Sequence, residues 1–225
     1  MPEQRPDSRS ESQIRPMATL QGTLSRADGS SKFSFDKTAV MASVFGPMEV
    51  KIRDELLDKA TVEVVLQPIE GHASTTEKYY EQIIRQTVES VALIALHPRT
   101  LIRITCQILN DDGSILSAAL NATMLALVDS GIPLKCMVAS TTCAVTANGQ
   151  VLLDPTRSEI ETAKSVHIFA FESLSGNLVA NESIGPFTEK EYTACHQLCQ
   201  AASEKIQAFM RASIERKLKK DHRLL

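Results

Sequence analysis

The sequence predicts a single α+β domain. Strand-like runs rich in β-branched residues are interspersed with three segments whose apolar residues recur at helical spacing. Turns rich in Gly, Pro, Asn and Asp separate these segments, and no repeat or long internal linker divides the chain. With 43% hydrophobic and 23% charged residues, the 225 residues are enough to bury a sizeable core.

The first 16 residues form a polar arm, and we expect the domain to span residues 17–225. The arm, MPEQRPDSRSESQIRP, has no apolar core segment, so it is predicted to be disordered and not a secretory signal. Met17 offers a second start site. No apolar run is long enough to span a bilayer, so we expect no membrane contact. The formal net charge of −3 gives no whole-chain attraction to nucleic acid.

Strands dominate the start of the domain. Asp28-Gly29 predicts a turn, and residues 38–45 predict a strand that Gly46-Pro47 closes. Residues 48–60 are mixed and charged, which favours a loop at an edge. The following run ATVEVVLQP predicts another strand, because it is rich in valine and ends in proline.

Two helices are predicted in the middle of the chain. Ser74 and Glu77 have the spacing of a capping box, and apolar residues then recur at helical spacing up to Leu96. His97-Pro98 ends this helix, and RTLIRITCQIL predicts the next strand. Residues 115–129 are largely apolar, so they predict a buried helix.

The last part of the chain predicts a buried strand, a hairpin and a long helix. KCMVASTTCAVT is the strand, and AKSVHIFAFESLSGNLVANESIG is the hairpin, which turns at residues 175–177. Thr188 and Glu191 form a second capping box for the helix, which has one apolar stripe. Its basic end, RKLKKDHR, either complements the helix C-terminus or contacts RNA.

The cysteines do not have the spacing of a zinc site. Cys195 and Cys199 lie one helical turn apart beside His196, but they offer at most three ligands on one helix face, with no second cluster. We therefore expect no metal site and no cofactor, and buried reduced thiols instead. The five cysteines are at positions 106, 136, 143, 195 and 199.

A glycine turn, Asp111-Asp112-Gly113-Ser114, leads into the buried helix. Such a turn is an anion site, because free backbone N–H groups and the helix dipole point toward it. A phosphate cradle normally adds a cation. The next positions are Ile115, Leu116 and Ser117, so the sequence predicts the backbone of an anion site without its charge.

The order of these elements, from about residue 20 to about residue 215, resembles the RNase PH family. DGSSKFSFDKTAVMASVFGP is similar to the opening hairpin of that family, DDGSILSAALNATMLALVDSGIP to its glycine-turn helix, and LLDPTRSEIETAKSVHI to its acidic segment. The resemblance implies an RNase PH-like domain, in which mixed sheets pack against helices in a two-layer β-α-β-α core. Active members of the family break an RNA 3′ linkage with inorganic phosphate.

The resemblance also implies where the catalytic groups would be. Active members carry an arginine in a D-G-G-x-R pattern and two acids about six residues apart, because the reaction needs a cationic cradle and carboxylates beside the scissile bond. Leu116 takes the place of the arginine, Asp154 matches the first acid, and Ile160 stands where the second belongs. Leu116 and Asp154 are then vestigial positions, and we expect no enzyme. Asp154-Pro155-Thr156 is also typical of a plain turn.

Three cations are candidates for RNA contact. Arg85 matches an arginine that active relatives direct toward phosphate or RNA, and Lys78 and Arg99 lie in the same region. The alternative is that all three are surface charges, with Arg85 pairing with Glu81 or Glu89 one turn away.

Within the family, the chain most resembles a short, non-catalytic ring subunit of the eukaryotic RNA exosome. This implies a hetero-hexamer with other RNase PH-like subunits, cap proteins with single-strand RNA-binding modules, and RNA threaded through a channel to a separate hydrolytic 3′-to-5′ nuclease. It implies RNA processing, including ribosomal RNA processing, and RNA degradation in the nucleus, nucleolus and cytoplasm. The alternatives are an active phosphate-dependent 3′-to-5′ exoribonuclease, or an unrelated α+β enzyme that uses His72, His167 or the cysteines.

Overall fold

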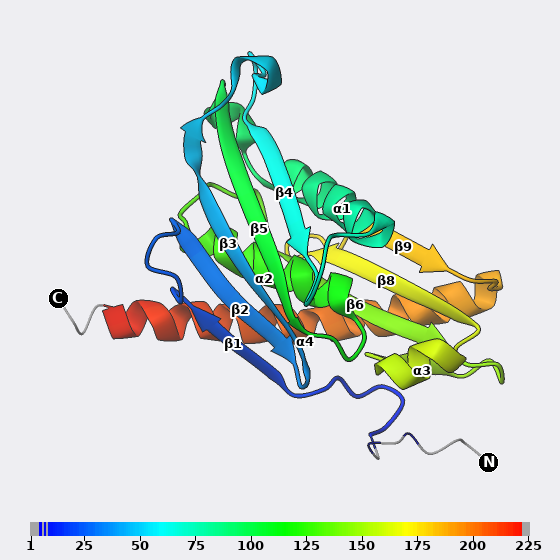
Figure 1. The fold of residues 1–225 in the computed structure, drawn as a ribbon. Coiled ribbons are helices and arrows are strands. Elements are labelled where there is room, and N and C mark those ends of the chain that lie inside the picture. The colour runs from blue at the N-terminus through cyan, green and yellow to red at the C-terminus, as the bar shows by residue number, and fades with distance from the viewer. Residues whose placement is uncertain (1–4, 6, 8, 222–225) are drawn as a thin grey trace.

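The computed structural model describes residues 5, 7 and 9–221, which form two β-sheets and helices in an α+β arrangement (Figure 1). The predicted fold class is confirmed. The strands are β1 (Met17–Gln21), β2 (Gly29–Phe35), β3 (Thr38–Glu49), β4 (Thr61–Gln67), β5 (Thr100–Asn110), β6 (Val138–Val145), β7 (Val151–Leu153), β8 (Ser165–Glu172) and β9 (Leu178–Ile184). The α-helices are α1 (Thr75–Val91), α2 (Ile115–Asp129), α3 (Arg157–Thr162) and α4 (Glu189–Asp221). The 3₁₀ helices are η1 (Ile52–Asp54) and η2 (Ile94–Leu96).

The first sheet has five strands in the order β1-β2-β3-β5-β4. Neighbouring strands run antiparallel except β4 and β5, which are parallel. Parallel neighbours need a crossover connection, and α1 supplies it. Phe33 and Phe35 of β2 and Val40 and Ala42 of β3 belong to the buried core, which is the inward half of the period-two pattern.

The second sheet has four antiparallel strands in the order β7-β6-β8-β9. Every residue of β6 is buried, as the continuous apolar and small-residue run VASTTCAV predicts for a central strand. The predicted hairpin is β8 and β9, joined through residues 173–177.

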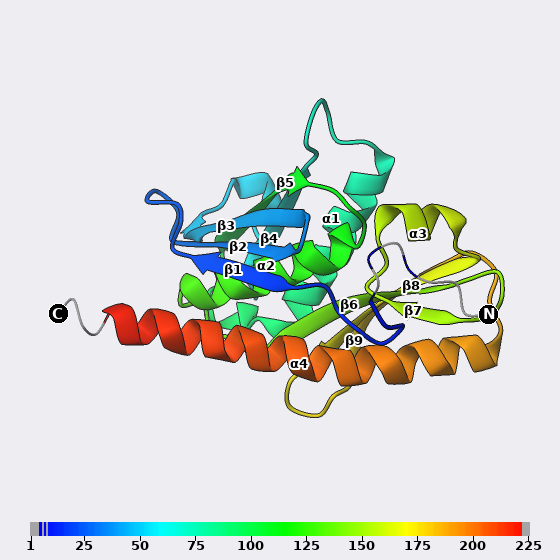
Figure 2. The same cartoon turned by 90° about the horizontal axis from the view of Figure 1, so that it is seen from below.

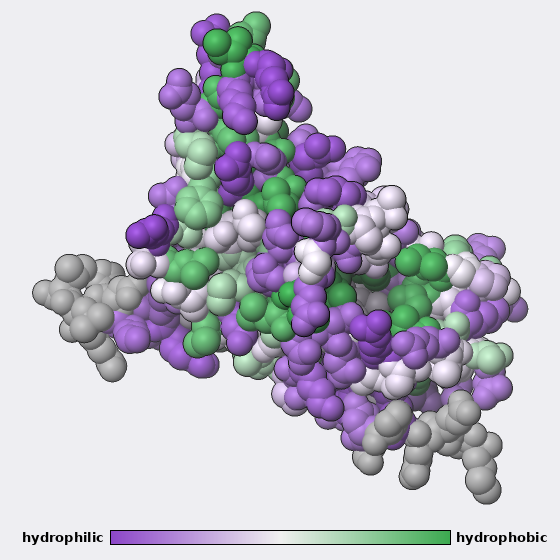
Figure 3. All heavy atoms as spheres, in the orientation of Figure 1, coloured by the Kyte–Doolittle hydropathy of each residue, from purple (hydrophilic) through white to green (hydrophobic). Residues whose placement is uncertain are grey.

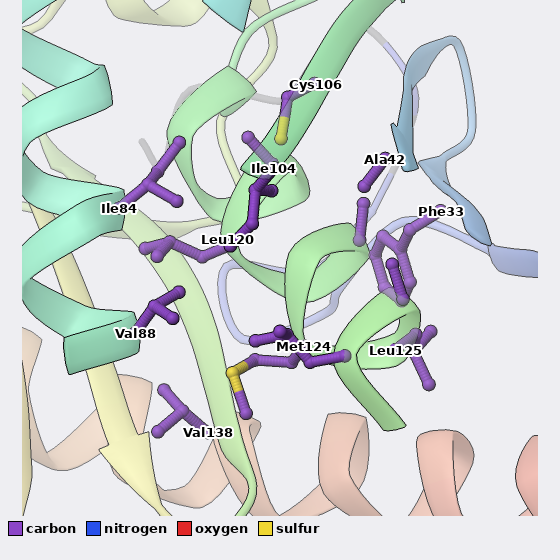
Figure 4. Close-up of a cluster of buried hydrophobic side chains, with 14 of the residues drawn as sticks. Phe33, Ala42, Ile84, Val88, Ile104, Cys106, Leu120, Met124, Leu125 and Val138 are labelled. Carbon is purple, nitrogen blue, oxygen red and sulfur yellow. The ribbon is translucent and has the colours of Figure 1, made fainter. Parts of the chain in front are cut away.

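Helix α2 lies between the two sheets and is buried on nearly all sides, from Leu116 to Leu127. Figure 4 shows Leu120 extending between Ile84 of α1 and Ile104 of β5. Burying one such side chain contributes about 1.5–3 kcal/mol relative to leaving it exposed. Helix α2 therefore fixes the position of the glycine turn at its own N-terminus.

Helix α4 runs along the molecule beneath both sheets (Figure 2). Its first half contributes Cys195, Cys199 and Ala202 to a small core under the second sheet. Its second half contributes Ile206 and Met210 to the main core. The predicted apolar stripe and capping box are both confirmed, since the Thr188 N–H donates to the Glu191 carboxylate at 2.8 Å.

Two boundaries and one short helix differ from the sequence prediction. Helix α1 ends at Val91 and not at Leu96, because Ala92 adopts an extended conformation and bridges to Leu134. Strand β3 continues to Glu49, with Gly46-Pro47 inside an irregularity of its pairing with β5 and not at its end. Helix α3 was not predicted, although Thr156 and Glu159 form a capping box at its start.

Across the described ranges, none of the helices has the length and apolar character needed to cross a membrane.

Candidate functional site

The glycine turn between β5 and α2 lies directly against the segment that begins at Asp154. The N–H of Arg157 donates to the carbonyl of Asp112 at 3.1 Å. Gly113 has a φ of +85°, and a Cβ added there would lie 2.9 Å from Ile160 Cδ1 and from the Pro155 carbonyl oxygen. Only glycine fits this approach. The structure therefore brings together the two motifs that the resemblance implied, with Ile160 beside the turn.

A buried apolar side chain occupies the position where a phosphate cradle would carry its cation. Leu116 is 1% exposed and belongs to the main core. The hydroxyl of Ser114 donates to the Pro155 carbonyl at 3.2 Å and makes no cap bond to α2. The side chains at this helix N-terminus thus offer an anion no positive charge.

Asp154, the one remaining acid of the pair, is fully engaged by Arg15. Arg15 Nη2 donates to Asp154 Oδ1 at 2.7 Å, and both its Nε and its backbone N–H donate to Oδ2 at 2.9 Å. The two side chains are 2% and 4% exposed. With both oxygens occupied and buried, this carboxylate is not available to a substrate or a metal.

Arg15 also donates hydrogen bonds to two backbone carbonyls of the glycine turn. Its Nη1 donates to the Asp112 carbonyl at 2.9 Å and its Nη2 to the Gly113 carbonyl at 3.4 Å. The Thr38 hydroxyl donates to the same Gly113 carbonyl at 2.7 Å. Burial acts to lower the pKa of Arg15, but the hydrogen bonds and charge of Asp154 raise it overall, so the guanidinium stays charged. A cation is present at the site, but it binds the carbonyl side of the turn.

The described part of the N-terminal arm is attached to the domain, which corrects the expectation of a disordered arm. Arg5 donates to both carboxylate oxygens of Glu159, at 2.8 and 2.9 Å, and to the Leu153 carbonyl at 3.1 Å. The N–H of Leu153 donates to the Glu11 carbonyl at 2.9 Å, so the arm also covers the edge of β7. The prediction for residues 1–4, 6 and 8 lies outside the described residues.

Sequence reasoning missed Arg5, Arg15 and Glu159. Arginines in a Pro- and Ser-rich segment look solvated, and nothing local indicates that their partners lie far along the chain. The capping-box spacing of Thr156 and Glu159 was the one available signal, because it predicts a helix that fixes the carboxylate in place.

Two of the three predicted RNA contacts lie together. Lys78 and Arg85 line a groove of about 580 Å³ between β4 and α1. Arg99 is not among the lining residues; it pairs with Glu55 at 3.5 Å. Arg85 is exposed and pairs with neither Glu81 nor Glu89, so the predicted alternative of an ion pair on α1 is wrong.

The residues considered for an unrelated enzyme, His72, His167 and the cysteines, lie in different surroundings. His167 is buried between the hydroxyls of Ser165 and Ser183, at 3.1 and 2.9 Å, and burial lowers its pKa. His72 is exposed in the loop before α1. All five cysteines are free and four are buried; burial raises the pKa of the Cys106 thiol to about 11. No group of three potential metal ligands occurs among the residues that the structure describes.

The chain matches one family in both of its halves. Residues 13–133 match domain 1 of the 3′ exoribonuclease (RNase PH) family, and residues 136–202 match domain 2. These matches include the glycine turn in the first half and Asp154 in the second.

Relatives are similar over nearly the full length. The rice protein named "Exosome complex exonuclease RRP46 homolog" is 33% identical, over 96% of this chain and 98% of its own. The budding yeast "Exosome complex component RRP46" is 34% identical, over 86% and 93%. The crystal structure of rice Rrp46 superimposes with a TM-score of 0.88 at 35% identity, covering 93% of this chain and 99% of that one.

Proposed function

Because the chain belongs to the 3′ exoribonuclease (RNase PH) family, we propose that it is a structural, catalytically inactive ring subunit of the RNA exosome. In this role it forms part of the channel wall through which RNA passes to a separate hydrolytic nuclease. The rice relative is named an exosome complex exonuclease and the yeast relative an exosome complex component, and both names support the assignment to this complex.

The proposal that the chain is inactive rests on the glycine turn, where the described side chains at the cradle and acid positions are not free to bind phosphate or to act on the scissile bond. Phosphorolysis needs a cationic cradle for phosphate and free carboxylates beside the scissile bond. Here Leu116 is buried in the core, and both oxygens of Asp154 are held by Arg15. Ile160 lies against the turn where the second acid would stand. Removing even one preorganised donor typically costs about a hundred- to a thousandfold in rate, so a site that lacks several groups supports no measurable turnover.

The partners follow from the same proposal. The chain joins other RNase PH-like subunits in a hetero-hexameric ring, with cap proteins that carry single-strand RNA-binding modules and with the hydrolytic 3′-to-5′ nuclease. It takes part in RNA processing and degradation in the nucleus, nucleolus and cytoplasm. Its own contribution to RNA binding is small, because the formal net charge is −3 and affinity for the RNA backbone follows the number of phosphates neutralised.

Activity is tested with the purified chain, a 3′-labelled and a 5′-labelled RNA, and inorganic phosphate. We expect no release of nucleoside diphosphates, and no polymerisation when nucleoside diphosphates are supplied. The useful control variant is Ile115→Glu, which places a negative charge at the first position of α2 and leaves the Arg15–Asp154 pair intact. Phosphate-dependent activity that persists through purification and disappears in Ile115→Glu would establish the rival proposal, an active exoribonuclease. Asp154→Asn is a poor control, because it disturbs the buried pair.

Assembly is tested separately by native mass spectrometry after tagging the chain at its C-terminus in its own cell. We expect one copy of this chain in a complex with other RNase PH-like proteins. Recovery of the chain as a monomer at its natural abundance would contradict the ring proposal without bearing on catalysis.

A further inference from the structure

The outer edge of β4 is open at its middle, whereas the N–H of Ala60, just before the strand, donates to the Ile94 carbonyl at 3.0 Å. β4 is the last strand of its sheet, and the N–H of Leu66 donates to Glu81 Oε1 on α1 at 3.0 Å, so this N–H points away from β5. The N–H and C=O groups of a strand residue share one direction, which alternates along the strand. Those of Val62 and Val64 therefore also point outward. In the part of the chain that the structure describes, no strand pairs with them.

This edge lies in the groove of about 580 Å³, which is also lined by α1, by the end of β3 with the residues that follow it, and by Leu101 and Arg103 of β5. Figure 1 shows β4 and α1 side by side, and Figure 3 shows mostly hydrophilic side chains over them. The side chains of Val62 and Val64 are buried in the core, although both residues line the groove. They therefore present mainly backbone to it, with hydrogen-bonding groups that a ligand is able to use.

The groove also holds two cations with no acidic partner in the described structure, Lys51 and Arg85. The other cations there are already paired: Arg53 with Asp54 at 3.2 Å, Lys78 with Glu81 at 2.9 Å and Arg103 with Glu63 at 2.9 Å. The lining is therefore nearly balanced in charge, with positive charge available only at these two positions.

These features favour a peptide over RNA. None of the residues lining the groove is aromatic, so the groove lacks the side chains on which single-stranded bases usually stack. Two free cations neutralise few phosphates, which gives weak binding to an RNA backbone. An open strand edge, in contrast, recognises the backbone of an extended peptide in register.

We propose that the groove between β4 and α1 binds an extended segment of a partner protein by strand addition. The segment pairs with the backbone of Val62 and Val64 and places acidic side chains beside Arg85 and Lys51. A strand opposite residues 61–65 would be about five residues long, at ~3.3 Å per residue. The binding needs only the folded chain, so it stands apart from the ring proposal.

The test is a selection of phage-displayed random peptides on the immobilised full-length chain, followed by fluorescence anisotropy with the synthesised winners. We expect Asp or Glu among β-branched residues in the enriched peptides. Affinity should fall about tenfold or more in Arg85→Glu, because a charge-assisted hydrogen bond is replaced by repulsion. It should also fall in Val64→Pro, which removes an outward N–H without touching the ladder to β5. The matched control is Arg99→Glu, an equal charge change outside the groove, and it should leave affinity unchanged.

Hydrogen exchange provides the second readout. The bound peptide should slow exchange of the Val62 and Val64 amides and leave β9, another edge strand, unchanged. Enrichment no greater than on the bare support, enriched peptides without acids, or affinity insensitive to both Arg85→Glu and Val64→Pro would each overturn the proposal. So would a short oligouridylate that binds the wild type and not Arg85→Glu while no peptide is enriched; the groove would then be an RNA contact.

Discussion

The glycine-turn site and the β4–α1 groove both place arginines near carboxylates, but with opposite results. At the glycine turn, Arg5 and Arg15 are each 2% exposed and each binds a carboxylate through two hydrogen bonds. In the groove, Arg85 is exposed and pairs with no acid among the described residues. The first set of charges serves the fold, and the second remains available to a partner.

The difference follows from what burial does to charge. A buried ion cannot recover its lost hydration unless an opposite charge and hydrogen bonds replace it, so breaking one buried pair costs about 3–5 kcal/mol. An exposed ion keeps its water and contributes about 0–1 kcal/mol when paired. In this molecule, therefore, burial distinguishes an arginine that stabilises the fold from one that can bind a ligand.

The largest expected effect comes from removing residues 1–16, so that the chain begins at Met17. This deletes Arg5 and Arg15, so Glu159 and Asp154 lose their arginine partners and the part of the chain that covers them. Two such losses, at about 3–5 kcal/mol each, approach the whole stability of a typical domain, about 5–15 kcal/mol. We expect a chain without a cooperative urea transition by far-UV circular dichroism. Deleting residues 1–4 keeps both arginines and should leave the transition unchanged. A Met17 chain that unfolds like the wild type would show that the arm does not stabilise the fold.

The second-largest effect on stability is expected when Leu116 is replaced by the arginine that active relatives carry in the glycine turn. Leu116→Arg puts a charge into the main core, where Leu116 is 1% exposed, and should lower the free energy of unfolding by about 3 kcal/mol or more. We expect no gain of phosphate binding in a thermal-shift titration. Leu116→Met, which keeps the volume and the apolar character, should lose less than about 1.5 kcal/mol. A stable Leu116→Arg chain that binds phosphate would mean that the cradle is open.

A smaller effect is expected from pH. Burial acts to raise the pKa of Glu159, but the hydrogen bonds from Arg5 and Thr156 and the charge of Arg5 lower it overall, below its ordinary value of 4.5. The unfolded chain then takes up the proton first as the pH falls. The Arg5–Glu159 pair therefore stabilises the fold fully above about pH 4.5 and loses this contribution as the pH falls through the folded-state pKa. Arg5→Met should cost about 3 kcal/mol at neutral pH, and less at about pH 3, where the carboxyl of the unfolded chain is protonated.

This pH dependence is measured by urea unfolding of the two proteins at both pH values. The matched control is Arg157→Met, which breaks the exposed pair with Asp111 and should cost less than about 1 kcal/mol at either pH. A gap between wild type and Arg5→Met that stays constant with pH would show that the Glu159 carboxylate does not titrate with folding.

The smallest effect is expected in the groove. Arg85→Glu removes no ion pair in the described structure, so it should change the free energy of unfolding by less than about 0.5 kcal/mol. Arg103→Glu, which breaks the pair with Glu63 at 2.9 Å, should cost slightly more. Differential scanning calorimetry measures both. A loss above about 1 kcal/mol in Arg85→Glu would mean that Arg85 already has a structural role.

The sequence predicts the elements that depend on local signals. The capping boxes at Ser74 and Thr188 mark two helix starts, and the period-two and helical apolar patterns place the long strands and α2. The short helix α3 was missed because its capping box follows a proline turn and six residues are too few to show a period. The early end of α1 was missed because the apolar run continues past Val91 into η2.

The site was predictable only in part, for the same reason. The resemblance to a family identified Leu116, Asp154 and Ile160 as the positions to examine. The partner of Asp154 lies 139 residues away in the arm, and a long-range pair leaves no periodicity in a single sequence. The three-dimensional fold is needed to show that the arm's arginines neutralise buried acids and that Arg85 pairs with no acid among the described residues.

The length of α4 has a consequence for how the two halves of the chain hold together. The family matches divide the chain between residues 133 and 136, but α4 begins in the second half and packs Ile206 and Met210 into the main core of the first. A helix of 33 residues extends about 50 Å, far enough to serve both cores. A protease cut between residues 133 and 136 would therefore produce two fragments that stay associated, because the C-terminal fragment carries part of the N-terminal fragment's interior.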